Sequence, residues 1–154
     1  GGMKTISVSV VVMITMAGLY GLTVFVFDRN AAVRDLRPFS DLMQAESWWL
    51  MLLAAAIGAP LAEETMFRGL LYGALRTSVT GALGAALISA VMWAALHGNY
   101  SMYGLVAIFM IGLYLAWLRE KTGSLVAPIV CHGVYNALIV LVITQTPQTA
   151  FQPV

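Results

Sequence analysis

Three short polar motifs interrupt an otherwise apolar chain of 154 residues. They are Glu63-Glu64-Thr65-Met66-Phe67-Arg68, Trp93-Ala94-Ala95-Leu96-His97 and His132-Gly133-Val134-Tyr135-Asn136. The chain has only eight basic and seven acidic residues, yet the first motif holds three of these charges within six positions. Ionisable side chains at membrane depth are costly and are usually functional. The motifs therefore predict a polar reaction centre inside a bilayer.

The first motif places two carboxylates on different faces of one predicted helix. Glu64 and Arg68 are four residues apart and share a face, where Arg68 can neutralise Glu64. Glu63 points about 100° away from Glu64 around the helix. This spacing gives Glu63 no partner, and an unpaired carboxylate in lipid is hard to justify structurally. We therefore assign Glu63 as a general base that faces a cavity. The competing interpretation is that the Glu64–Arg68 pair only fixes the register of the helices.

The two histidines lie in or at the end of other apolar segments. His132 and Asn136 are four residues apart, so both project from one helix face and can donate hydrogen bonds to a developing oxyanion. His97 lies at the end of its predicted helix, one turn beyond Trp93. A lone histidine is more often a core residue, but here both histidines accompany the one acidic pair of the apolar segments. A base, a second group that binds water and two oxyanion donors suit hydrolysis of a peptide bond by an activated water.

Other protease classes fit this sequence less well. It has no Gly-x-Ser-x-Gly motif, so a serine intramembrane protease is not expected. All three aspartates, Asp28, Asp35 and Asp41, lie in a charged segment that we expect at the membrane surface, which argues against an aspartyl protease. The single cysteine, Cys131, is expected to pack in the core.

The composition predicts an all-α polytopic membrane protein. Hydrophobic residues make up 60% of the chain, and about 20 apolar residues cross the hydrocarbon core as a helix. We expect about five transmembrane helices in one bundle with a polar intramembrane cavity, over residues 4–27, 47–76, 80–97, 101–119 and 125–144. The net charge of +1 gives no reason to expect a nucleic-acid partner.

In their order on successive apolar segments, the three motifs resemble those of the CPBP family. These are the CAAX-prenyl and bacteriocin-processing intramembrane proteases, also called Abi proteins. Arg68-Gly69-Leu70-Leu71 after the first motif and Thr122-Gly123-Ser124-Leu125 before the third agree with the resemblance, which covers about residues 34–140. One residue departs from the pattern, because the second motif usually begins with Phe and here begins with Trp93.

The resemblance implies an intramembrane endopeptidase, for which we favour a glutamate-type mechanism. Its site would consist of the polar residues of the three motifs: Glu63, Glu64, Arg68, His97, His132 and Asn136. Glu63 and His97 would activate the water, while Glu64 and Arg68 would support Glu63. The expected substrate is a membrane-associated peptide or a prenylated protein.

The family has been described both as metal-dependent and as glutamate-type. Zinc bound by Glu63, His97 and His132, with a fourth position open for water, is the metal-dependent alternative. We favour the interpretation without a cofactor. The chain has no His-Glu-x-x-His motif, and Asn136 suits an oxyanion donor better than a zinc ligand.

We expect the chain to divide into four parts. Residues 1–27 are expected to form an N-terminal transmembrane anchor helix, 28–46 an interfacial segment on the membrane surface, 47–144 the catalytic core and 145–154 a C-terminal tail. The expected location is the cytoplasmic membrane of a bacterium. The chain is short for the family, which leaves room for a partner membrane subunit.

Two other functions stay open at this point. The first is a non-catalytic member of the family that serves as a membrane scaffold or assembly subunit. The second is a pigment or haem subunit with His97 and His132 as axial ligands, which would leave the Glu-Glu-Arg cluster unexplained.

Overall fold

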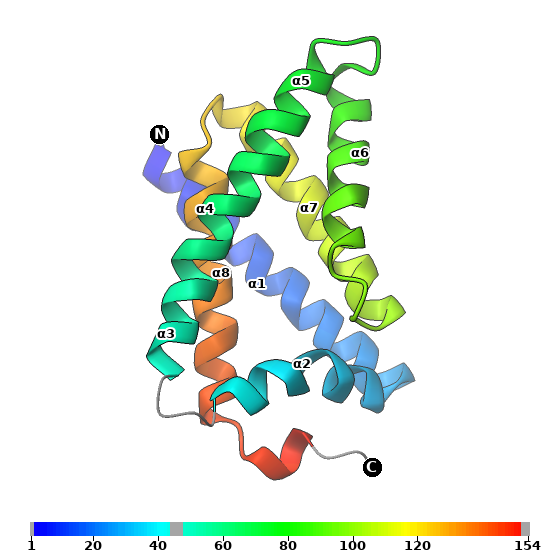
Figure 1. Ribbon diagram of the computed structural model, residues 1–154, viewed down its shortest axis with the longest axis vertical. Helices are drawn as coiled ribbons and strands as arrows, with labels where there is room; N and C mark the ends of the chain where they lie inside the picture. Colours follow the sequence, from blue (N-terminus) through cyan, green and yellow to red (C-terminus); the bar gives the residue numbers. More distant parts are fainter. Residues whose placement is uncertain (1, 44–47, 152–154) are drawn as a thin grey trace.

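The computed structural model describes residues 2–43 and 48–151, which form helices joined by short turns (Figure 1). No strand occurs within these two ranges. Lipid leaves the backbone of an isolated strand unsatisfied, whereas a helix satisfies its own N–H and C=O groups. The predicted all-α fold is confirmed.

Among the described residues, four helical stretches are long and apolar enough to cross a membrane: Met3–Phe27 within α1 (Gly2–Phe27), Trp48–Arg76, α7 (Met102–Thr122) and α8 (Val126–Gln145). The predicted span over residues 80–97 is shorter. Its helix, α6 (Gly81–Ala95), has 15 residues, or about 22 Å at about 1.5 Å per residue. The chain is an all-α polytopic membrane protein, and the part that the structure describes has four membrane-length helices and this shorter apolar helix.

The stretch Trp48–Arg76 is one continuous helix that contains two π-helical segments. Its parts are α3 (Trp48–Leu53), η1 (Ala54–Gly58), α4 (Ala59–Glu64), η2 (Thr65–Leu71) and α5 (Tyr72–Arg76). A π turn bonds residue i to residue i+5, as the Ala59 N–H does with the Ala54 carbonyl. Pro60 follows the first π segment, lacks an N–H and would clash in an α-helix with the carbonyl of Ala56. The wider turn at η1 accommodates this proline.

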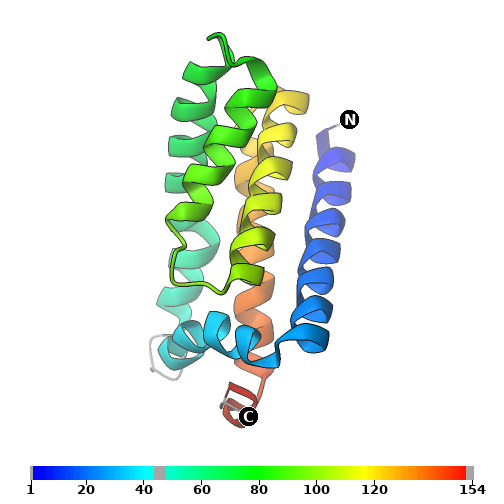
Figure 2. The same ribbon diagram turned by 90° about the vertical axis from the view of Figure 1, so that its right-hand side faces the viewer.

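Helix α2 (Arg29–Met43) lies across one end of the other helices (Figures 1 and 2). Its Asp35 is almost fully buried, with 3% of its surface exposed. The carboxylate accepts hydrogen bonds from the Tyr20 hydroxyl at 2.5 Å and from the Ser101 N–H and hydroxyl at 2.6 and 2.7 Å. Ser101 is also the N-cap of α7. Asp35 therefore ties α1, α2 and the start of α7 together.

The burial of Asp35 within the protein is a feature that the sequence did not reveal. Asp41, by contrast, has 62% of its side chain exposed. Asp28 pairs with Arg34 at 2.9 Å, and this hydrogen bond holds the pKa of the Asp28 carboxyl below its usual value. The position of α2 on a membrane surface stays a prediction.

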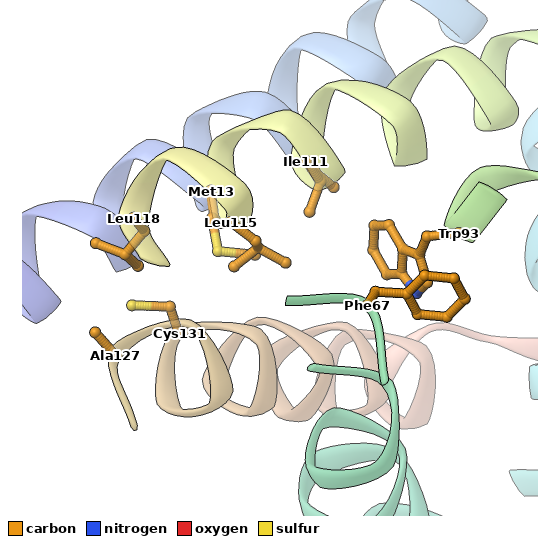
Figure 3. Packing of buried hydrophobic residues seen from close by; sticks show 8 residues of the cluster. All are labelled: Met13, Phe67, Trp93, Ile111, Leu115, Leu118, Ala127 and Cys131. Carbon is orange, nitrogen blue, oxygen red and sulfur yellow. The ribbon is translucent and has the colours of Figure 1, made fainter. Parts of the chain in front are cut away.

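A cluster of buried apolar side chains joins α1, α7 and α8 to the helix of the first motif. Its members are Met13, Phe67, Trp93, Ile111, Leu115, Leu118, Ala127 and Cys131. Figure 3 shows Phe67 and Trp93 together at one end of the cluster. Cys131 is fully buried, in agreement with its predicted packing role. The cluster holds the aromatic residue of the second motif against the first motif.

We expect the Asp35→Asn substitution to destabilise the fold. In the wild type, three hydrogen-bond donors face the carboxylate oxygens of Asp35, and asparagine would present an amide nitrogen to some of them. Hydrogen bonds to charged groups contribute about 1.5–3 kcal/mol each. Thermal unfolding in detergent micelles measures the loss. The exposed Asp41→Asn variant is the control, and an equal effect of the two substitutions would show that Asp35 does not tie the helices together.

Candidate active site

A cavity of about 760 Å³ opens among α1, α2, α4, α6, α7, α8 and η1. Most of its lining side chains are apolar, which suits a segment of a membrane-associated molecule. Polar residues from all three sequence motifs line it, among them Glu63, His97, His132 and Asn136. The structure thus brings these four residues, which belong to three separate motifs, to one cavity.

Behind the cavity wall, Glu64 and Arg68 form a fully buried ion pair. The Arg68 Nη1 donates to Glu64 Oε1 at 2.9 Å, and neither side chain has any exposed surface. The predicted pairing on one helix face is therefore observed. The second guanidinium nitrogen, Nη2, donates to the carbonyl of Gly112 on α7 at 3.1 Å. A side chain at position 112 would crowd this nitrogen, since an added Cβ would lie 3.2 Å from it.

His132 joins this pair from α8. Its Nδ1 lies 2.9 Å from the same Oε1 atom of Glu64. An ionised carboxylate only accepts hydrogen bonds, so Nδ1 carries a proton and the ring orientation is set by Glu64. The other nitrogen, Nε2, then holds a lone pair in the neutral ring and an N–H only in the imidazolium. A role as oxyanion donor therefore uses the imidazolium form of His132, with Glu64 as the adjacent anion.

His97 lies in the turn that follows α6, not in the helix itself. Its backbone N–H donates to the Ala94 carbonyl at 2.9 Å, and its Nδ1 lies 2.9 Å from the Trp93 carbonyl. A carbonyl only accepts, so Nδ1 carries the proton and Nε2 of the neutral ring holds a lone pair. The turn carries His97 back to the cavity, although the helix ends two residues before it.

Glu63 faces away from Glu64, as the helix spacing predicts. It is partly exposed and lines the cavity, whereas Glu64 is fully buried. Its Oε2 accepts a hydrogen bond from the indole Nε1 of Trp93 at 2.6 Å. Spacing along one helix assigned Glu63 no partner, and the structure supplies one from α6. An apolar helix with a buried tryptophan could have suggested this bond, because a buried indole N–H usually finds an acceptor.

Asn136 donates from Nδ2 to the carbonyl of Ala55 in η1 at 2.9 Å. In the π register, the donor to this carbonyl would be the N–H of residue 60, which is a proline. The Asn136 amide supplies the missing hydrogen bond and keeps a second N–H free of this contact. Gly133, one turn earlier on α8, approaches the same segment so closely that an added Cβ would overlap the Ala56 carbonyl oxygen. Neither Pro60 nor Gly133 was identified from the sequence.

Tyr100 is a further polar residue of the cavity wall that sequence reasoning missed. Its ring contacts that of His97 edge to face, with centroids 5.8 Å apart. Burial raises the pKa of Tyr100 well above its usual value, and the negative charge of Asp35 acts in the same direction. The phenol therefore stays protonated at neutral pH and is a hydrogen-bond donor.

The donors for the zinc alternative are of suitable types, but they are not arranged as a metal site. Within residues 2–43 and 48–151, no group of three His, Cys, Asp or Glu side chains is placed to hold a metal ion. The Nε2 atoms of His97 and His132 would be the ligand atoms, since each Nδ1 already has a hydrogen-bond partner. Zinc binding would require Glu63 and these rings to move together.

The fold and the site define a membrane-embedded protein whose acidic, imidazole and amide groups meet at an apolar cavity. A model of the type II CAAX prenyl endopeptidase Rce1-like family matches residues 45–138. The chain belongs to this family, which confirms the resemblance seen in the three motifs.

Three curated bacterial proteins are similar to this chain. An "Uncharacterized 24.3 kDa protein" of Escherichia coli is 34% identical over 85 residues, which are 54% of this chain and 39% of that protein. The "Putative membrane peptidase YdiL" of Bacillus subtilis (strain 168) is 28% identical over 117 residues, or 76% of this chain and 46% of that protein. The UPF0177 protein YxdF of Lactococcus lactis subsp. lactis (strain IL1403) is 27% identical over 128 residues, which are 82% of this chain and 70% of that protein. No solved structure is significantly similar to the chain. The chain thus spans less than half the length of the first two relatives.

We expect Gly133→Ala to disturb the site as well as the fold. The added methyl group would overlap the Ala56 carbonyl, so α8 must move away from η1 and carry His132 with it. Such overpacking typically costs about 1–3 kcal/mol, which thermal unfolding in micelles measures. Gly73→Ala is the matched control, since nothing lies within 4 Å of a Cβ added there. Equal stability of the two variants would contradict the close helix contact.

Proposed function

We propose that the protein is an intramembrane endopeptidase that hydrolyses a peptide bond with an activated water. The main supporting observation is the meeting of Glu63, His97 and His132 around Trp93 at one cavity. Glu63 accepts a hydrogen bond from the indole, and the two imidazole rings contact the same indole edge to face, with centroids 5.2 and 5.4 Å away. Membership of a type II CAAX prenyl endopeptidase-like family supports the same activity.

In the first step, Glu63 takes a proton from a water in the cavity. The lone pair on His97 Nε2 accepts the other hydrogen of that water and orients its oxygen. The resulting hydroxide attacks the carbonyl carbon of the scissile peptide bond and forms a tetrahedral oxyanion. General-base help of this kind contributes about 10²–10⁴-fold to a rate.

In the second step, the oxyanion is stabilised and the carbon–nitrogen bond breaks. His132, as the imidazolium, donates from Nε2, and Asn136 donates its second amide N–H. Glu63 returns its proton to the leaving nitrogen, so the products are a carboxylic acid and an amine. Glu64 and Arg68 do not line the cavity, and their role is to position His132 and the helix that carries Glu63.

The proposed substrate is a membrane-associated peptide or a prenylated protein. The apolar walls of the cavity support this proposal, because they can take up an apolar chain from the bilayer without leaving polar groups unpaired. The proposed location is the bacterial cytoplasmic membrane, in line with the three bacterial relatives. The edge-to-face contacts of both histidines with Trp93 give the haem alternative no support.

The test of the base is the Glu63→Gln variant, assayed on candidate membrane peptides in proteoliposomes. Glutamine keeps the size of the side chain and can still accept the indole hydrogen bond, so the protein should fold while cleavage falls about 10²–10⁴-fold. Cleavage by Glu63→Gln at the wild-type rate would overturn the assignment. Full biological function of this variant, with no cleavage by the wild type, would favour the scaffold. Wild-type activity should persist in chelator, whereas loss in chelator and recovery with zinc would favour the metal alternative.

The supporting ion pair predicts a different result for Arg68→Ala. This substitution leaves the buried Glu64 carboxylate without its cation, and breaking a buried pair costs about 3–5 kcal/mol. We expect a marked fall in thermal stability together with lower activity, measured on the same preparation. Arg34→Ala is the control, because 55% of the Arg34 side chain is exposed and surface pairs contribute about 1 kcal/mol or less. Normal stability of Arg68→Ala would show that the pair is not required for folding.

A further inference from the structure

Trp93 contacts four of the polar residues of the candidate site. Only 3% of its surface is exposed. Its indole N–H donates to Glu63 at 2.6 Å, and the guanidinium carbon of Arg68 lies 4.5 Å from its ring centre. The rings of His97 and His132 pack edge to face against it. One side chain therefore touches groups from α4, η2, α8 and the turn after α6.

We propose that Trp93 is a positioning residue that fixes the direction of the Glu63 carboxylate. The proposal rests on the proposed function, in which Glu63 is the base. The indole N–H holds one carboxylate oxygen, Oε2, at the wall of the cavity. The other oxygen is then directed to the water that is to be deprotonated.

The physical reason is the freedom of a glutamate carboxylate. Its last torsion angle has a broad, roughly two-fold preference, so the position of the two oxygens is poorly defined without a partner. A hydrogen bond to an anion is shorter and stronger than one to a neutral acceptor, and 2.6 Å is a short N–H···O distance. Because packing fixes the buried indole, the Glu63 carboxylate orients toward the indole N–H.

The departure from the usual phenylalanine of the second motif thus has a chemical consequence. Phenylalanine at position 93 would keep an aromatic ring beside Arg68 and the histidines, but it has no N–H to give to Glu63. If Trp93 only packs against its neighbours, its effect depends on the shape of the ring. If Trp93 positions Glu63, its effect depends on the indole N–H. A substitution that removes the N–H and keeps the ring shape therefore distinguishes the two roles.

The activity experiment compares Trp93→Phe with a site-specific benzothienyl isostere of tryptophan, in which sulfur replaces the indole N–H. If Trp93 positions Glu63, both variants should lose kcat by about 10–100-fold, the range expected for misplacement of a catalytic group. KM should stay unchanged, because substrate binding does not use this hydrogen bond. Trp117→Phe is the matched control: Trp117 is 50% exposed on α7, lies outside the cavity wall and should keep normal kcat. If Trp93→Phe fails to fold, the kcat of the isostere variant, which preserves the ring shape, tests the positioning role.

A second measurement does not depend on activity. Proton–nitrogen NMR of the indole groups in micelles should show the Trp93 N–H signal shifted to high frequency by its short hydrogen bond. Glu63→Ala should move that signal and leave the Trp117 signal in place. A wild type that cleaves nothing would defeat the proposed function while this measurement still tests the hydrogen bond. Normal kcat in the isostere variant, or a Trp93 signal indifferent to Glu63→Ala, would overturn the positioning role.

Discussion

The architecture of the site depends on one buried carboxylate, that of Glu64. An isolated charge inside a membrane protein is too costly to persist, so its partners must arrive with it. Arg68 comes from the same helix and His132 from α8, and both bind Oε1. Arg68 also reaches the Gly112 carbonyl of α7. Three helices are thereby fixed in register around one anion, and the helix that buries Glu64 must turn Glu63 toward the cavity.

Backbone irregularity in the same helix supplies a second constraint. Pro60 removes an N–H just after the π segment η1, which leaves the Ala55 carbonyl in need of a donor. Asn136 provides that donor from α8, and Gly133 allows the close approach that the bond requires. The amide proposed for the oxyanion site thus also satisfies the backbone. Its position is set by the fold before any substrate enters.

Single-helix periodicity predicted part of this arrangement. The different directions of Glu63 and Glu64 and the Glu64–Arg68 pair follow from spacing along one helix. Cross-helix partners do not, because they depend on how helices pack. The sequence therefore did not show that His132 bonds to Glu64, or that Trp93 bonds to Glu63. The burial of Asp35 was not predicted for the same reason: it depends on Tyr20 and Ser101, which are distant in sequence. The turn that returns His97 to the cavity also lay beyond what helix periodicity can predict.

The central claim is that Glu63 acts on a water and does not itself attack the peptide bond. A single turnover in heavy-oxygen water, followed by mass spectrometry of product and enzyme, tests this claim most directly. Direct attack by water predicts one heavy oxygen in the new carboxyl group of the product and none in the Glu63 carboxylate. Heavy oxygen in Glu63, or a covalent adduct between Glu63 and the substrate acyl group, would contradict the account.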